Sequence, residues 1–200
     1  MHLLETPRLI LRPPSHRDEL LLHGLHSDPF VVDAIRDGSY PTIEQSRAAL
    51  LHFIAHWQYH RFGLWMVFVK DERQAREFVG YTGLMCSGTY RPEDSNGLPG
   101  DSNNVEIVTG LHLAASGKGI GVEAGRAVVQ FAFEHLKLQK VTAFIRRHNI
   151  RSLIKNVKVG FFYVSDIKVK NGMRRKFEVS PLTHVKSDNL RVIHFNDTEL

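Results

Sequence analysis

The first third of the chain shows apolar and polar patterns that predict one strand and two helices. Leu9–Arg12 has the two-residue period of a strand. Two prolines and a serine then interrupt the pattern and offer an N-cap for a helix over about residues 16–27. Thr42 and Gln45 have the spacing of a capping box, and the apolar residues after them recur at helical spacing. A second helix is therefore expected over residues 42–61.

Extended runs occupy the middle of the chain. Leu64–Lys70 and Phe78–Ser87 are rich in aromatic and β-branched residues and are separated by a charged segment, which predicts an antiparallel pair. Residues 88–104 are dense in Gly, Pro, Asn, Asp and Ser and form a connection that is long for a compact domain. Val105–Leu113 is the next predicted strand.

The second half of the chain alternates between helical and extended patterns and ends in a hairpin. After a glycine-rich turn, the apolar residues lie on one helical face, so a helix begins at about Val122. Asn171 and Gly172 are typical of a two-residue hairpin turn, which needs positive φ at both central positions. The remaining predicted elements are a strand at 140–145, a short helix at 149–158, and hairpin strands at 161–170 and 174–179.

This order of elements predicts a single domain of the α/β or α+β class around a mixed sheet. We expect the domain to span residues 1–181, followed by a C-terminal tail over residues 182–200. Within the tail, Leu190–Phe195 is either an extra edge strand or part of a loosely held terminus.

The composition is that of an ordinary globular protein, with 42% hydrophobic and 24% charged residues, which excludes collagen, a coiled coil and general disorder. The single cysteine, Cys86, cannot form an internal disulfide and reads as a buried thiol. Charged residues interrupt the apolar N-terminus, which excludes a signal peptide or a membrane span there. We therefore expect a cytoplasmic protein without a membrane partner.

The net charge of +5 is compatible with an anionic ligand, an acidic partner or nucleic acid. No interleaving of aromatic and basic residues supports a nucleic-acid surface, so none is expected.

The turn Ser116–Gly121 reads Ser-Gly-Lys-Gly-Ile-Gly between a predicted strand and a predicted helix. Glycines let the backbone approach a bulky anion, and the first N–H groups of a helix are unpaired donors at the positive end of its dipole. The spacing excludes a P-loop and meets the dinucleotide-binding fingerprint only in its looser form. The turn therefore holds a phosphate group or, alternatively, is a strand-to-helix turn without a ligand.

From Glu106 to Phe161, and more loosely from Glu5 to Ser180, the sequence resembles the GNAT superfamily of acetyl-CoA-dependent N-acetyltransferases. Within it, the chain is similar to the Rim-type enzymes that acetylate the N-termini of ribosomal proteins. The features that carry the resemblance are Glu5-Thr-Pro-Arg-Leu-Ile-Leu-Arg12, Phe62-Gly-Leu-Trp65, Gly117-Lys-Gly-Ile-Gly-Val-Glu-Ala124, and Asn149-Ile-Arg-Ser152 with Gly160-Phe161. The resemblance implies a GNAT-like domain whose mixed, mostly antiparallel central sheet is flanked by helices.

The resemblance also implies which residues hold acetyl-CoA. The strand end from Leu111 to Leu113 would pair with the pantetheine arm and the acetyl carbonyl, and Asn149 and Ser152 would meet the cofactor on its far side. The backbone N–H groups expected to bind the pyrophosphate are those of Gly117, Lys118, Gly119, Ile120, Gly121 and Val122.

Acetyl transfer requires a neutral amine, so a group that accepts a proton is expected. Glu106 matches a glutamate of the Rim-type relatives and is the predicted base; the alternative is a strand-edge carboxylate in a salt bridge. Many relatives have a tyrosine at the position of Asn156 that protonates the leaving thiolate, and an asparagine cannot serve as that acid. Ser152 is the remaining candidate for this role.

Histidine is common, with 12 residues, and His52, His56 and His60 recur every fourth position on a predicted helix. Three stacked turns cannot all reach one ion, so no metal is expected, and a partly exposed helix face is the simpler interpretation. His112 lies near the end of the expected cofactor strand, and its direction depends on whether that strand is bulged.

These observations predict an N-acetyltransferase that transfers acetyl directly from acetyl-CoA to a primary amine in a ternary complex. The acceptor expected from the resemblance is a protein N-terminal α-amino group, and the alternatives are a small amine such as a polyamine or aminoglycoside. A catalytically silent acyl-CoA-binding domain and a basic nucleic-acid module remain open. The protein is expected to be a monomer or a homodimer.

Overall fold

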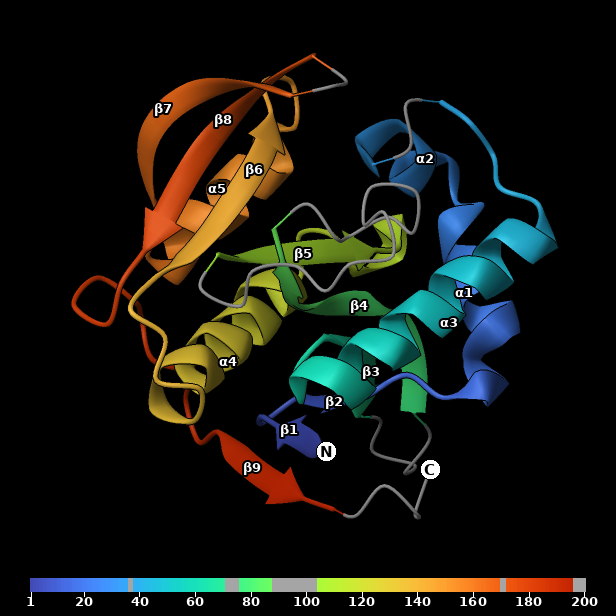
Figure 1. The fold of residues 1–200 in the computed structure, drawn as a ribbon, viewed down its shortest axis with the longest axis horizontal. Coiled ribbons are helices and arrows are strands. Elements are labelled where there is room, and N and C mark those ends of the chain that lie inside the picture. Colours follow the sequence, from blue (N-terminus) through green and yellow to red (C-terminus); the bar gives the residue numbers. More distant parts are fainter. Residues whose placement is uncertain (36–37, 71–75, 88–103, 170–171, 196–200) are drawn as a thin grey trace.

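The computed structural model describes residues 1–35, 38–70, 76–87, 104–169 and 172–195 (Figure 1). Strands and helices follow one another along most of these ranges. In chain order they are β1 (His2–Glu5), β2 (Leu9–Arg12), α1 (Glu19–His26), α2 (Pro29–Ile35), α3 (Ile43–His60), β3 (Leu64–Lys70), β4 (Arg76–Cys86), β5 (Val105–Leu111), α4 (Ile120–Glu134), β6 (Val141–Arg146), α5 (Ile150–Val159), β7 (Phe162–Val169), β8 (Gly172–Val179) and β9 (Arg191–His194). Two short 3-10 turns, η1 (His16–Asp18) and η2 (Leu113–Ala115), lie before α1 and α4.

In the described part of the chain, the strands form one nine-stranded sheet in the order β7-β8-β6-β5-β4-β3-β2-β1-β9. Neighbouring strands are antiparallel except β5 and β6, which are parallel. The predicted mixed, mostly antiparallel sheet flanked by helices is therefore confirmed.

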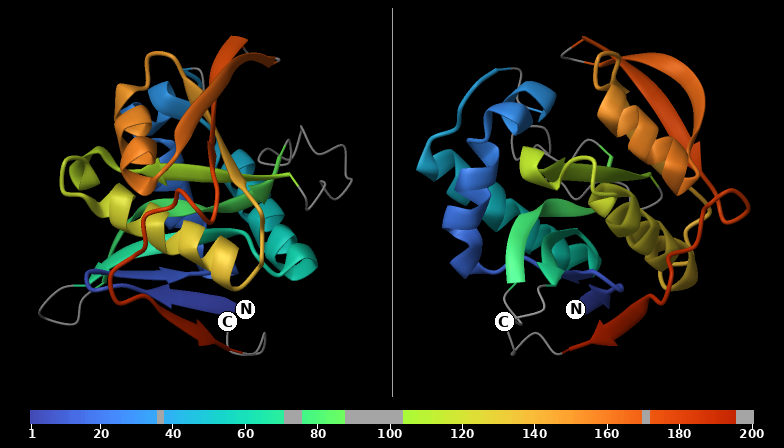
Figure 2. Two further views of the ribbon diagram at one scale, coloured as in Figure 1. Left: turned by 90° about the vertical axis from the view of Figure 1, so that its left-hand side faces the viewer. Right: turned by 180° about the vertical axis from the view of Figure 1, so that it is seen from behind.

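Helices cover both faces of the sheet and bury two groups of apolar residues (Figure 2). On one face, Phe131 of α4 packs edge-on against Trp65 of β3, with ring centroids 5.3 Å apart. On the other face, α1 and α3 bury residues such as Leu50 against Leu64 and Tyr81. Successive side chains of a strand point to opposite faces of the sheet, so Leu64 and Trp65 pack in different hydrophobic cores. None of the described helices has the length and apolar composition needed to cross a membrane.

The structure adds two elements that the sequence pattern does not predict, β1 and α2. β1 has only four residues and pairs with β2 and β9. α2 begins at Pro29, and the preceding Asp28 accepts a hydrogen bond from the Phe30 N–H at 2.9 Å. A capping aspartate followed by proline is a usual helix start. The signal was present in the sequence, but α2 is too short to show helical periodicity.

Two predicted boundaries differ from the structure. The strand expected over residues 105–113 ends at Leu111, because Leu113–Ala115 fold into η2. The helix expected over residues 16–27 is divided into η1 and α1. The long connection expected over residues 88–104 lies, apart from Asn104, outside the described residues, as does Asn171 of the expected hairpin turn.

The C-terminal segment returns to the start of the chain. β9 pairs with β1 along its whole length, and the N-terminal ammonium of Met1 donates to the Phe195 carbonyl at 2.8 Å. Leu190 and Val192 pack against the hydrophobic core that contains Trp65 and Phe131. The first and last described strands therefore lie side by side at one edge of the sheet (Figure 1).

Candidate active site

Strands β5 and β6 lie together over a short distance and then separate. The register pairs Glu106 on β5 with Thr142 on β6, and Thr142 Oγ1 donates to the Val105 carbonyl at 3.0 Å. Beyond this point, β6 runs steeply away from β5 together with β7 and β8 (Figure 1). Strands that separate inside a sheet leave backbone donors and acceptors that a ligand can pair with. The opening between β5 and β6 is therefore a candidate binding site.

A cavity of about 400 Å³ lies beside the part of β5 that β6 leaves unpaired, a size suited to a small molecule. Its walls are the end of β5 with the following turn, helix α5, and helix α2. Arg151 of α5 lies over the ring of Phe30 of α2, 4.8 Å from the ring centroid, and so connects two of these walls. The lining residues are Phe30, Val31, Ala34, Thr109, Gly110, Leu111, His112, Ala115, Ser116, Gly117, Gly119, Gly121, Val122, Asn149, Arg151, Ser152, Ile154, Lys155 and Lys158.

The turn before α4 has the backbone geometry of an anion-binding site. Gly117 and Gly119 have φ values of 78° and 76°, a left-handed conformation that residues with a Cβ rarely adopt. The N–H groups of Val122 and Glu123 both donate to the Gly119 carbonyl. The N–H groups before them lack a helical partner and lie at the positive end of the helix dipole. Donors in this arrangement bind phosphate.

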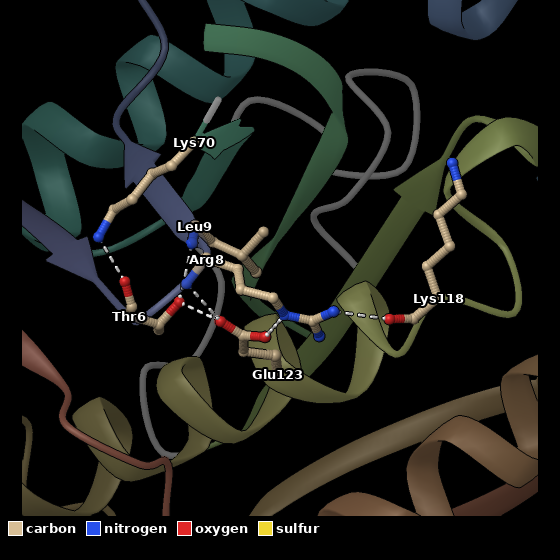
Figure 3. Close-up of polar contacts among 6 residues, drawn as sticks. All are labelled: Thr6, Arg8, Leu9, Lys70, Lys118 and Glu123. Atoms are coloured by element: carbon tan, nitrogen blue, oxygen red, sulfur yellow. Dashed lines mark hydrogen bonds and ion pairs between the residues drawn. The ribbon is translucent and has the colours of Figure 1, made fainter. Parts of the chain in front are cut away.

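An ion pair from the β1–β2 connection holds this turn in place (Figure 3). Arg8 Nε donates to Glu123 Oε2 at 2.6 Å, and Arg8 Nη1 donates to the Lys118 carbonyl at 2.9 Å. Thr6 Oγ1 donates to Glu123 Oε1 at 2.6 Å. Burial raises the pKa of Glu123, but the hydrogen bonds from Thr6 and Arg8 outweigh it, and the net pKa is lowered. We call Thr6, Arg8, Lys118 and Glu123 the turn clamp.

The cavity wall formed by α5 is positively charged. Arg151, Lys155 and Lys158 line the cavity, and none of them forms an ion pair with a carboxylate of the described ranges. Lys155 Nζ donates to Thr109 Oγ1 at 3.0 Å, which lies 2.8 Å from Thr82 Oγ1. Enclosure of the ammonium group lowers the pKa of Lys155 to about 8. This wall is suited to an anionic ligand.

The structure brings most of the predicted cofactor residues together. Those that line the cavity are Leu111, Gly117, Gly119, Gly121, Val122, Asn149 and Ser152. Lys118 and Ile120 line a second cavity of about 390 Å³. Leu113 lies in η2, lines neither cavity and is 49% exposed.

Sequence reasoning missed several residues of the site. The residues of α2 were missed because the helix itself was not predicted. Arg8 and Glu123 stand in two of the motifs that carry the resemblance, but the sequence does not show that they contact each other over 115 positions. The sequence pattern also does not indicate Lys155, although it falls between Ser152 and Asn156, two residues that the resemblance singles out.

The two predicted catalytic residues have different surroundings. Glu106 is outside the lining of both cavities and lies on the same face of β5 as Val108, which packs against the α1 and α3 side of the sheet. Ser152 lines the cavity, and its hydroxyl accepts a hydrogen bond from Asn156 Nδ2 at 3.3 Å. Asn156 is buried and does not line the cavity. Both catalytic roles stay predictions.

The histidine stripe of α3 divides into two parts. His56 and His60 lie beside Cys86 of β4, with their ligand atoms within 4.8 Å of one another, and His52 is outside this group. His56 Nε2 accepts from the Cys86 N–H at 3.2 Å, and His56 Nδ1 donates to the Phe62 carbonyl at 2.9 Å. Burial lowers the pKa of His56 to about 4. A neutral ring with both nitrogens engaged supports the fold rather than a metal. Cys86 is buried, as expected.

Comparisons with known proteins identify relatives of this fold. Residues 8–161 match a family model described as the acetyltransferase (GNAT) domain. The acetyltransferase (GNAT family) from Bacillus anthracis matches with a TM-score of 0.70 and 18% identity, over 89% of this chain and 98% of that chain. An acetyltransferase from Agrobacterium tumefaciens str. C58 matches with a TM-score of 0.70 and 20% identity, over 88% of this chain and 93% of that chain.

A further similar structure is that of the aminoglycoside acetyltransferase AAC(6')-Ib in complex with coenzyme A and kanamycin. It matches with a TM-score of 0.68 and 16% identity, over 88% of this chain and 96% of that chain. At these identities the solved structures show a shared fold. The family model spans most of the chain, from Arg8 through the glycine turn to just past the end of α5.

Proposed function

We propose that this chain, which belongs to the acetyltransferase (GNAT) domain family, is an enzyme that moves an acetyl group from acetyl-CoA to a primary amine. The observation that carries the proposal is the cavity at the end of β5, where β6 has diverged from it. It joins a glycine turn, a strand end with open backbone groups, and a cationic helix. Acetyl-CoA combines a pyrophosphate, a thin pantetheine arm and a thioester, and the cavity offers a partner to each part.

The roles of the lining residues follow from this fit. The backbone N–H groups of residues 117–122 bind the pyrophosphate, and the turn clamp keeps them oriented. The backbone around Leu111, which β6 leaves open, pairs with the pantetheine arm and the acetyl carbonyl. Arg151 and Lys158 add positive charge near the phosphates. Ser152 is the proposed proton donor to the leaving thiolate.

The reaction is a direct transfer in a ternary complex. The lone pair of a neutral amine attacks the acetyl carbon, a C–N bond forms, the C–S bond breaks, and sulfur leaves with the electron pair. Backbone N–H groups that polarise the acetyl carbonyl stabilise the charge that develops on its oxygen. The single cysteine, Cys86, is buried and lines neither cavity, which fits a mechanism without an acetylated thiol.

For the acceptor, we propose the α-amino group at the N-terminus of a protein, on the resemblance to the Rim-type enzymes. An α-amino group has a pKa near 8, so a usable fraction is neutral at physiological pH, whereas a lysine with a pKa near 10.4 is almost fully charged. An aminoglycoside is the second candidate, because a structure solved with kanamycin shares this fold. Acetyl-CoA is an intracellular metabolite, which agrees with a cytoplasmic location.

The test is an acetyl-transfer assay with acetyl-CoA and, separately, a short peptide with a free α-amino group and kanamycin. The proposal predicts release of the CoA thiol and one added acetyl group on the peptide in its mass spectrum. The same peptide with a blocked N-terminus is the control and should not react. Transfer to kanamycin alone would assign the small-amine alternative. Absence of transfer to either, with acetyl-CoA binding retained, would instead indicate a silent acyl-CoA-binding domain.

A further inference from the structure

A histidine and an aspartate from distant parts of the chain meet at the end of β5. His112 follows β5 directly, and its Nδ1 lies 2.8 Å from Oδ2 of Asp28 in the α1–α2 connection. The Asp28 carboxylate also accepts hydrogen bonds from the backbone N–H groups of Phe30 and Leu113. Burial raises the pKa of Asp28, but these hydrogen bonds outweigh it, and the net pKa is lowered. The carboxylate is therefore ionised at neutral pH and can only accept hydrogen bonds.

An ionised carboxylate next to Nδ1 fixes the tautomer of the His112 ring. Nδ1 carries the proton that is donated to Asp28, so the neutral ring keeps a lone pair on Nε2. No residue within the described ranges hydrogen-bonds this Nε2. A ring that is oriented by a carboxylate and has a free second nitrogen is arranged to accept a proton from a substrate.

His112 faces both cavities at this end of the sheet. Together with Ala115, it lines the first cavity, at the end of β5, as well as the second cavity, which is also lined by Asp28. The His112 side chain is 29% exposed, so it is accessible from a cavity. The proposed function places the acetyl group against the backbone around Leu111, the residue before His112. The His112 ring therefore lies at the wall shared by the second cavity and the cavity that holds the acetyl group in the proposed function.

We propose that His112 is the general base of the acetyl transfer, positioned by Asp28, and that the acceptor amine enters through the second cavity. This inference rests on the proposed function. The amine nitrogen forms the C–N bond to the acetyl carbon, the C–S bond breaks, and its electron pair goes to the CoA sulfur, which Ser152 protonates before the serine regains a proton from solvent. The proton that the amine loses passes to Nε2 of His112. Asp28 stabilises the imidazolium, which then returns the proton to solvent.

Other charged groups line the same two cavities as His112. Glu77 of β4 and Lys118 of the glycine turn line the second cavity, while Arg151, Lys155 and Lys158 of α5 line the first. Asp28 and Glu77 favour a cationic amine in the second cavity, and Lys118 partly offsets them. Among the titratable residues that the structure describes, only His112 lines both cavities.

The test compares the wild-type protein with His112→Asn and Asp28→Asn. Asparagine at position 112 keeps an N–H donor for Asp28 but removes Nε2. The control is His16→Asn, because His16 is exposed on η1 and lines neither cavity. Thiol release is measured with acetyl-CoA and, in turn, a peptide with a free α-amino group, spermidine and kanamycin, across the pH range in which histidine titrates. Acetyl-CoA affinity is measured by calorimetry for every variant.

We expect wild-type kcat/KM to rise with pH along an acidic limb that His112→Asn lacks, with activity about a hundredfold lower in this variant. Asp28→Asn should lose less activity and move the limb to lower pH, because the carboxylate no longer stabilises the protonated ring. His16→Asn should match the wild type, and all variants should bind acetyl-CoA alike.

An unchanged acidic limb in His112→Asn would overturn the assignment of the base and leave the proposed function intact. Parallel loss of acetyl-CoA binding and activity would show a structural role and overturn it as well. A wild-type protein that binds acetyl-CoA but releases no thiol with any of the three amines would overturn the proposed function, and this inference with it.

Discussion

Two parts of the site present their functional groups in different ways. In the glycine turn, the groups are backbone N–H donors held by left-handed glycines and by the turn clamp. At the end of β5 they are side chains, such as the His112 and Asp28 pair, whose members are 84 positions apart. A backbone site depends on conformation, whereas a side-chain site depends on chemical identity. Substitutions that alter backbone conformation should therefore damage the glycine turn, and substitutions that alter side-chain chemistry should damage the His112 and Asp28 pair.

The largest effect expected in the glycine turn comes from Gly119→Val. A β-branched residue at a φ of 76° costs about 1–3 kcal/mol, and relaxing this strain turns the N–H groups away from the pyrophosphate. Acetyl-CoA affinity should fall up to about a hundredfold, which corresponds to about 2.8 kcal/mol. Calorimetry measures this directly.

The control for this variant is Gly24→Ala. Gly24 lies within α1, and a Cβ there meets no atom within 4 Å. This substitution should stabilise the helix by about 1 kcal/mol and leave acetyl-CoA affinity unchanged. Equal affinity in Gly119→Val and the wild type would show that the turn does not hold the cofactor.

The next effect concerns the ammonium group in the cavity wall and is tested with Lys155→Met. The folded-state pKa of about 8 lies below the ordinary value of 10.5, so the folded protein binds fewer protons than the unfolded chain between these two pH values. The stability of the wild type therefore rises with pH through this window, and the cost of the buried charge is fully present below pH 8.

Without ligand, we expect Lys155→Met to be more stable than the wild type by about 2 kcal/mol at neutral pH, within the roughly 3 kcal/mol that this shift represents. The difference should shrink as pH rises through the window, and denaturant unfolding at several pH values measures it. Lys158→Met removes a charge from the more exposed part of the same helix and serves as the control. A difference that stays constant with pH would contradict the enclosure of the Lys155 ammonium.

A smaller effect is expected from Arg8→Met, which removes the cationic member of the turn clamp. The Arg8 side chain is 52% exposed, so the ion pair itself contributes less than about 1 kcal/mol. The substitution also frees the Lys118 carbonyl, and acetyl-CoA affinity should fall about fivefold, or about 1 kcal/mol. Arg47→Met breaks the Arg47–Glu19 pair, whose N–O distance is 2.7 Å, away from the cavity, and should leave affinity unchanged. An equal loss of acetyl-CoA affinity in Arg8→Met and Arg47→Met would indicate that affinity depends on the net charge of the protein rather than on the turn clamp.

The smallest effect is expected from Glu106→Gln. Glu106 lines neither cavity, so turnover should change less than about threefold if His112 is the base. A loss of about a hundredfold in turnover, with acetyl-CoA affinity retained, would assign the base to Glu106 and remove it from His112.

The glycine turn could be predicted from the sequence because its functional groups are adjacent in the chain. A strand, two glycines and an amphipathic helix specify an anion-binding turn through local backbone conformation. Some of the other elements could also be predicted, since β2 and α3 show hydrophobic periods and β3 is a run rich in aromatic and β-branched residues. The order of the strands and the separation of β5 from β6 are set by tertiary packing, which periodicity does not show.

The His112 and Asp28 pair depends on a contact that a single sequence does not reveal. The sequence places His112 near the strand end, but its direction is seen only in the structure, where Asp28 lies beside it just before α2. The resemblance assigns the base to Glu106, whereas in the structure Glu106 lines neither cavity. Side-chain chemistry that is assembled across many positions requires the structure.

Calorimetric titration with acetyl-CoA, in parallel with ATP, tests the central claim that the opening between β5 and β6 is an acyl-CoA site. ATP offers phosphates but no pantetheine arm and no thioester. We predict one-to-one binding of acetyl-CoA with a micromolar dissociation constant, strong weakening in Gly119→Val, and no comparable binding of ATP. Absence of acetyl-CoA binding, or equal binding of the two nucleotides, would contradict the account.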